Sequence, residues 1–271
     1  MVRDRFAHSL AVATLVVLAG CGGFVGAEPT PRERVTPAPV PTDAEAYPPG
    51  ISAEGVAASA VTEAHERQLR DANYTFRSRQ RVVGPNGTMW VTNRTRMVAN
   101  GVSEYTGRID HRVVEFPLGR FPDPIEYWGN ESVYASRRIL TDRTEFYGWS
   151  RLDDGPREVT SLPLLGRTLG ATSVSVVDRP NGVVLVGTTL RDPARLPIPP
   201  YLSNPRNVSL TVRVTDSGLV TRWRLAYTAT LENRTVRVTR RARLTAVGTT
   251  TVERPEWVDV ARQRMQARSD D

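Results

Sequence analysis

The sequence predicts an α+β protein built on one large, curved antiparallel β-sheet, a half-barrel of about ten strands. An N-terminal helix, a short central helical segment and a short C-terminal helix are expected beside it. Two observations lead to this prediction. From Asn73 onward, polar and apolar residues alternate with the period of two that is typical of strands with one buried face. Turn sequences such as Asn100-Gly101 separate these stretches, so neighbouring strands are expected to form hairpins.

The first element of the folded part is predicted to be a helix over residues 52–72. Apolar residues recur there at helical spacing from Val56 to Leu69. His65 precedes Glu66 on this helix, but the helix of a zinc protease would need a second histidine at the position of Leu69. We therefore interpret His65 as a packing residue.

The strands follow along the chain, and the last three are expected to turn their apolar residues to one side and Arg213, Arg222 and Arg224 to water. Leucines within 158–170 predict a short helix or an apolar lid between the strands. A proline-rich loop is expected over 192–205, and a last helix over 256–268. The predicted strands are 74–82, 89–97, 105–109, 113–116, 132–138, 143–151, 173–178, 183–190, 208–215, 219–231 and 235–247.

The chain begins with a pattern typical of an export signal. Arg3 and Arg5 precede an apolar run over residues 9–20, and this run is shorter than the roughly 20 residues of a transmembrane helix. Cleavage by a lipoprotein signal peptidase before Cys21 would attach the chain by lipid to the extracellular face of the cell membrane. Secretory cleavage near Ala27 is the alternative, and the export route stays open. The residues before the lipoprotein cleavage site are Leu18, Ala19 and Gly20.

With cleavage before Cys21, the chain is expected to have three parts. Residues 1–20 are the expected signal peptide. Residues 21–46 hold the lipidated cysteine and a segment of Pro, Thr, Ala and Glu, which lacks the apolar surface needed to fold and is expected to be an extended spacer. Residues 47–271 are the expected single folded domain, long enough for a core of its own.

Composition excludes several kinds of chemistry. The chain has no lysine, which rules out Schiff-base catalysis and the phosphate-binding lysine of a P-loop. One cysteine and three histidines cannot build a zinc site of the usual soft ligands once Cys21 is lipidated and His8 is removed. We expect no metal and no cofactor. His111 beside Asp110 is interpreted as an exposed turn pair, and acidic residues such as Asp123 lie in turns, so no enzyme activity is expected.

The surface is expected to be basic and glycosylated. The formal net charge is +7, which suits either a solvated surface or contact with anionic lipid or glycan. Nucleic acid is not an expected partner, because the protein is exported and carries no aromatic-basic RNA motif. Six Asn-X-Ser/Thr sites are candidates for N-glycosylation. They start at Asn73, Asn86, Asn93, Asn130, Asn207 and Asn233.

Two segments carry a resemblance to a known family. The stretch from Tyr47-Pro48-Pro49-Gly50 to Tyr74-Thr75-Phe76, and the closing Val252–Trp257, are similar to an uncharacterised family of haloarchaeal cell-surface lipoproteins. The order of elements also resembles that of the LolA-like and LppX-like lipoprotein carriers of bacteria. That resemblance implies a half-barrel that holds acyl chains.

The expected function is a membrane-anchored, extracytoplasmic module that binds a lipid or another apolar ligand in the concave face of its sheet. The alternative is a non-catalytic structural or interaction protein of the cell envelope, with a protein or polymer partner. Alternating apolar residues also line ordinary cores, so the lining set is a hypothesis. The candidate lining residues are Tyr74, Phe76, Met89, Met97, Trp223 and Tyr227.

Overall fold

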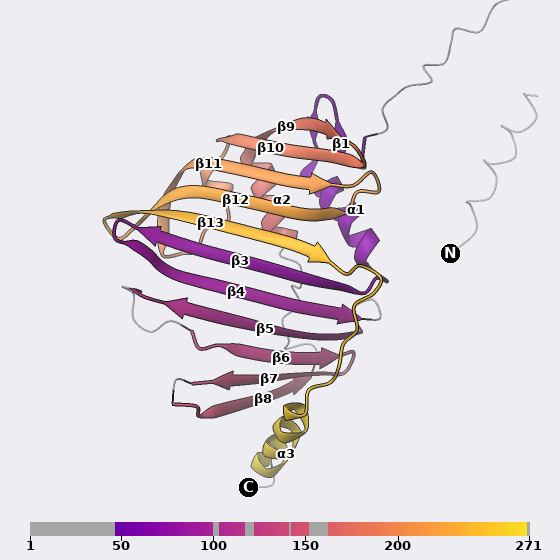
Figure 1. Cartoon of the computed structure of the whole chain (residues 1–271), viewed down its shortest axis with the longest axis vertical. Coiled ribbons are helices and arrows are strands. Elements are labelled where there is room, and N and C mark those ends of the chain that lie inside the picture. Colours follow the sequence, from indigo (N-terminus) through magenta and orange to yellow (C-terminus); the bar gives the residue numbers. More distant parts are fainter. Residues whose placement is uncertain (1–46, 100–102, 117–121, 141, 152–161, 270–271) are drawn as a thin grey trace, which may run out of the picture. The chain divides into compact units, whose positions relative to one another are not determined.

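The computed structural model describes residues 47–99, 103–116, 122–140, 142–151 and 162–269. Its centre is an antiparallel sheet of 11 strands, which confirms the predicted fold class (Figure 1). The spatial order is β8-β7-β6-β5-β4-β3-β13-β12-β11-β10-β9. The strands are β3 (Tyr74–Gly84), β4 (Gly87–Ala99), β5 (Glu104–Val113), β6 (Ile125–Asn130), β7 (Val133–Ile139), β8 (Glu145–Arg151), β9 (Thr172–Arg179), β10 (Gly182–Leu190), β11 (Leu202–Val214), β12 (Val220–Leu231) and β13 (Arg234–Thr245).

The sheet consists of two meanders that meet in the middle. Each strand of β3 to β8 pairs with the next in sequence, and the same holds for β9 to β13. Pairing between β13 and β3 then joins the two, with Ala242 opposite Ser78. The sheet is open, because β8 and β9 each have one neighbour.

Two helices cover one face of the sheet, which we call the inner face. They are α1 (Ala58–Leu69) and α2 (Leu162–Ala171), which lie behind the sheet in Figure 1. Leu165 of α2 belongs to the same buried cluster as Phe76 and Trp223, so the main core lies between these helices and the inner face. The helix predicted over 158–170 is thus present, and its first residues, 158–161, lie outside the described part. A short hairpin of β1 (Ile51–Ser52) and β2 (Gly55–Val56) precedes α1.

The third helix, α3 (Trp257–Ser269), packs on the opposite face, which we call the outer face. Trp257 and Val258 form a second buried cluster with Trp128 and Ala135 of β6 and β7. The two faces therefore have different cover, with α1 and α2 on the inner face and α3 on the outer one.

The prediction of a separate strand at 113–116 is wrong, and β6 was not predicted. Residues 104–113 form one continuous strand instead, and the next strand is β6. In β6, Tyr127 is buried on the inner face while Trp128 is buried under α3 on the outer face. Burial on both faces removes the polar alternation that reveals a strand in sequence.

The proline-rich loop is also shorter than predicted. Strand β11 begins at Leu202, inside the expected loop of 192–205, and contains Pro205. Two register shifts against β12 accommodate this start, and Asn204 and Asn207 have φ values of 51° and 53°. Bulges of this kind allow a proline to lie within a strand.

Candidate functional site

A hollow of about 470 Å³ opens on the inner face, between the sheet and loop residues such as Phe116 and Tyr201. Its floor is a row of four residues, Arg240, Gln80, Thr92 and His111, which lie directly opposite one another across β13, β3, β4 and β5. The strand register alone creates this row, because its members are far apart in the sequence. The full lining is Ser78, Gln80, Thr92, Arg94, His111, Phe116, Pro122, Pro199, Tyr201 and Arg240.

Two aromatic rings form an apolar wall at this hollow, and a third ring lies buried against them. Phe116 and Tyr201 line it, and both pack edge-on against the fully buried ring of Trp90. The ring centroids are 5.2 Å apart for Trp90 and Phe116, 6.0 Å for Trp90 and Tyr201, and 5.8 Å for Phe116 and Tyr201. Such edge-to-face contacts hold aromatic side chains in fixed positions.

The polar part of the hollow is cationic. Arg94 is exposed and has no ion-pair partner among the described residues, and Arg240 lies over the ring of Trp223 at 5.5 Å from its centroid. Among the described lining residues none is acidic. The hollow therefore combines an apolar wall with the cationic side chain of Arg94, and it favours a ligand that has one apolar and one anionic part.

His111 contributes a neutral polar group. Burial lowers the pKa of His111, and the charge of Arg94 lowers it further while Asp110 opposes the shift. Its Nδ1 shares a hydrogen bond of 3.1 Å with the Thr92 hydroxyl. The interpretation of His111 and Asp110 as an exposed turn pair is wrong. His111 lies in β5 on the inner face, whereas Asp110 points to the outer face and accepts a hydrogen bond from Arg108.

The six candidate lining residues lie outside this hollow. Tyr74, Phe76, Trp223 and Tyr227 belong to the packed core with at most 7% of each residue exposed, and Met89 is buried in the same cluster. Met97 lies opposite Thr75 in the register, so it is on the outer face. The residues that do line the hollow were missed because most of them are polar and four lie in loops. Their positions become visible only when the strands are paired.

The histidine on α1 has the role expected of it. His65 is buried, and its Nδ1 accepts a hydrogen bond of 3.0 Å from the backbone amide of Val220. Burial lowers its pKa to about 4. This confirms the interpretation of His65 as a packing residue.

The glycosylation candidates differ in their surroundings. The side-chain amide of Asn73 donates to the Thr250 carbonyl at 3.0 Å, and Asn130 Oδ1 accepts from two backbone amides that follow it. The other four candidates are exposed and stay candidates: Asn86, Asn93, Asn207 and Asn233.

The predicted lipidation site lies outside the described residues. The same holds for Leu18, Ala19 and Gly20 before it, and for the spacer up to residue 46. Among the described residues, no helix has the length and apolar character needed to cross a membrane. The described part also holds no group of three or more metal-ligating side chains.

Comparison with known proteins gives only distant likenesses, and these are to solved structures. No family model matches the chain, and no curated protein matches it. Among solved structures, the crystal structure of a LolA superfamily protein from Nitrosomonas europaea is similar over 73% of this chain and 96% of that chain. The sequence identity is 9% and the TM-score is 0.26, and a likeness this weak carries no argument about function.

Proposed function

We propose that this protein is a non-catalytic binding module that holds an amphiphile, an apolar chain with an anionic head, in the inner hollow. We further propose that lipid on Cys21 anchors it outside the cell. The observation that supports the ligand class is the position of Arg94, a cation without a described acidic partner, beside the wall formed by Phe116 and Tyr201.

The size and chemistry of the hollow agree with this proposal. Its volume of about 470 Å³ lies in the range of about 300–1,000 Å³ that is usual for small-molecule sites. The aromatic wall and two prolines offer apolar surface to an acyl chain. Arg94 can donate several hydrogen bonds to a carboxylate or phosphate head group.

The proposal is tested with the full chain in a neutral detergent and a fluorescent long-chain fatty acid. We expect saturable binding, weakened roughly tenfold by Arg94→Ala, because hydrogen bonds to charged groups contribute about 1.5–3 kcal/mol. Arg67→Ala is the matched control, since Arg67 is an exposed arginine of α1. It should leave the affinity unchanged.

A second ligand separates the contributions of head and tail. A fatty alcohol of the same length lacks the anionic head and should bind more weakly to the unchanged protein. Absence of fatty-acid binding would contradict the proposal. So would equal binding by the Arg94→Ala variant and the unchanged protein.

A further inference from the structure

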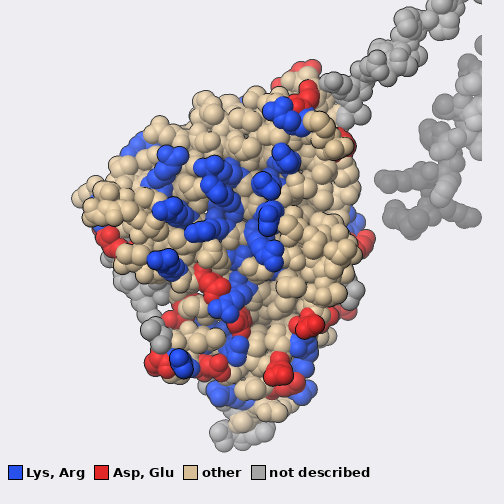
Figure 2. Space-filling model, in the orientation of Figure 1, with Lys and Arg blue, Asp and Glu red and all other residues tan. Residues whose placement is uncertain are grey.

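The outer face carries two rows of arginines that run across the strands. In the first row, four arginines of β11, β12, β13 and β3 lie directly opposite one another, and in the second row three arginines of β12, β13 and β3 do the same. All seven are exposed, and Figure 2 shows basic side chains gathered over these strands. We call these residues the arginine grid. They are Arg213, Arg222, Arg243 and Arg77 in the first row, and Arg224, Arg241 and Arg79 in the second.

The spacing within the grid follows from sheet geometry. Neighbours in a row are on adjacent strands, about 4.8 Å apart, and the two rows are separated by two residues along each strand, roughly 6.6 Å. Like charges directly opposite each other on a sheet destabilise it. A sheet that needed only solubility would place acidic residues between these arginines.

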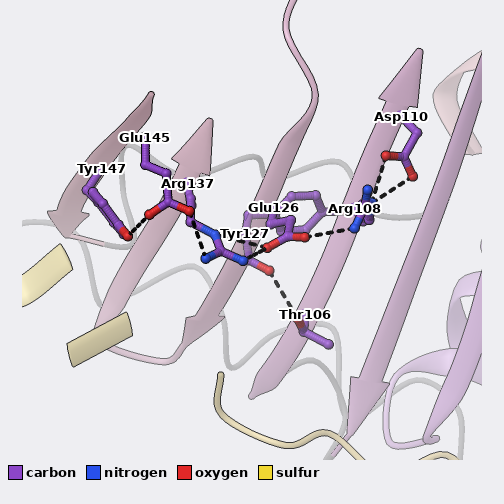
Figure 3. Close-up of polar contacts among 8 residues, drawn as sticks. All are labelled: Thr106, Arg108, Asp110, Glu126, Tyr127, Arg137, Glu145 and Tyr147. Carbon is purple, nitrogen blue, oxygen red and sulfur yellow. Dashed lines mark hydrogen bonds and ion pairs between the residues drawn. The ribbon is translucent and has the colours of Figure 1, made fainter. Parts of the chain in front are cut away.

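The other half of the same face does place acids between its arginines (Figure 3). The first row continues across β4 to β8 as Thr95, Arg108, Glu126, Arg137 and Tyr147. Arg108 Nη1 lies 3.0 Å from Glu126 Oε1, and Arg137 Nη2 lies 2.6 Å from Glu126 Oε2. In the described part of the chain, no grid arginine has such an acidic partner. The charge is balanced internally on one half of the face and left uncompensated on the other.

A groove of about 590 Å³ lies at the grid. Arg222, Arg243 and Arg77 line one side of it, and Arg224, Arg241 and Arg79 line the other. Between the two rows lie Trp223, Ala242 and Ser78, whose side chains point to the inner face. The groove thus runs across the strands with a line of cations on both sides. It continues onto β4 with the neutral side chains of Asn93 and Thr95 and with Arg94 between them, whose side chain points to the inner face like that of Ser78 opposite it.

We propose that this groove binds a linear polyanion, a polymer that carries repeated phosphate or sulfate groups, laid across the strands. The planar guanidinium fork of arginine matches such oxyanions with two parallel hydrogen bonds. Two facing lines of cations suit a chain of anions better than a single small anion. A flat membrane surface fits less well, because the cations border a recess and no large apolar side chain is exposed among its described lining residues.

This inference does not depend on the inner hollow, because the grid and the hollow lie on opposite faces. A polymer bound at the grid would leave the hollow free. The two sites can therefore be tested separately on the same protein.

The test measures binding of inorganic polyphosphate and of dextran sulfate to the full chain in neutral detergent at several salt concentrations. If six arginines each neutralise one anion, the slope of log K against log salt should be roughly −4. The double variant Arg222→Gln with Arg241→Gln should make the slope less steep, roughly −3, and should weaken binding about tenfold or more. Preference for one polymer would identify phosphate or sulfate as the favoured anion.

The matched control carries Arg67→Gln and Arg191→Gln, two exposed arginines outside the grid, and should bind like the unchanged protein. The grid variant should also melt no lower than the unchanged protein, because it removes repulsion between like charges. Absence of binding to either polymer at low salt would overturn the proposal. An equal loss in the control, or grid-dependent binding to vesicles of anionic phospholipid without polymer binding, would overturn it as well.

Discussion

The guanidinium carbon of Arg96 lies 4.1 Å from the centroid of the Tyr105 ring. Arg96 is only 3% exposed, and it also approaches the Tyr127 ring at 5.9 Å. Burial lowers its pKa, and the neighbouring tyrosines oppose this shift. No ion pair to Arg96 is present in the described part of the chain. Aromatic faces therefore stabilise a buried cation between β4, β5 and β6.

This arrangement predicts that lysine is a poor replacement for Arg96. A lysine ammonium is compact and strongly hydrated, so Arg96→Lys should lower the free energy of unfolding by about 2–3 kcal/mol. Arg96→Met removes the charge at similar length and should cost less. Urea unfolding of both variants measures the difference. A lysine variant more stable than the methionine variant would contradict this account.

At two positions only glycine fits, because a tyrosine ring on the adjacent strand occupies the space of a side chain. A Cβ at Gly129 would lie 2.5 Å from the Tyr105 ring, and one at Gly107 would collide with the Tyr127 ring. Gly129→Ala should therefore lower the free energy of unfolding by about 1–3 kcal/mol. Gly170→Ala in α2 is the control, since nothing beyond its chain neighbours and the backbone of its own helix lies within 4 Å of the added Cβ. This substitution should stabilise the protein by up to about 1 kcal/mol. Thermal and urea unfolding compare the two, and equal effects would refute the packing argument.

Stability should fall in mild acid because of His65. Its pKa is lowered from 6.5 to about 4 in the folded protein, so the unfolded chain binds more protons between these values. The stability contributed by the neutral ring is present above pH 6.5 and decreases as the pH falls, by roughly 3 kcal/mol at pH 4. His65→Gln should show a weaker pH dependence. Urea unfolding at pH 7 and pH 4.5 tests this, and parallel losses in both proteins would exclude His65 as the cause.

Replacement by arginine should unfold the protein at Trp223 but not at Met97. Trp223 is 4% exposed in the core under α2, so Trp223→Arg is expected to unfold the protein. Met97 is half-buried on the outer face between Thr75 and Thr106, so Met97→Arg should preserve both the fold and fatty-acid binding. Circular dichroism and the binding assay measure both outcomes. Loss of binding by a folded Met97→Arg variant would instead support Met97 as a ligand contact.

Local sequence patterns were sufficient to predict much of the sheet. The hairpin of β3 and β4 and the outward direction of Arg222 and Arg224 followed from alternation and turn residues, because each strand there has one buried face. Strand β6 could not be found in this way. It is covered on both faces, and its second cover, α3, is more than 100 residues away in the sequence.

The sequence by itself determined the order of most elements, the polarity of most faces and an excess of arginine over acidic residues. Only the tertiary structure decided which residues meet. Pairing of β13 with β3 brings Arg243 opposite Arg77 and Arg240 opposite Gln80, which creates the arginine grid on one face and the floor of the hollow on the other. Residues this far apart in the chain are related by strand register alone, and a shift of one residue would exchange the two faces.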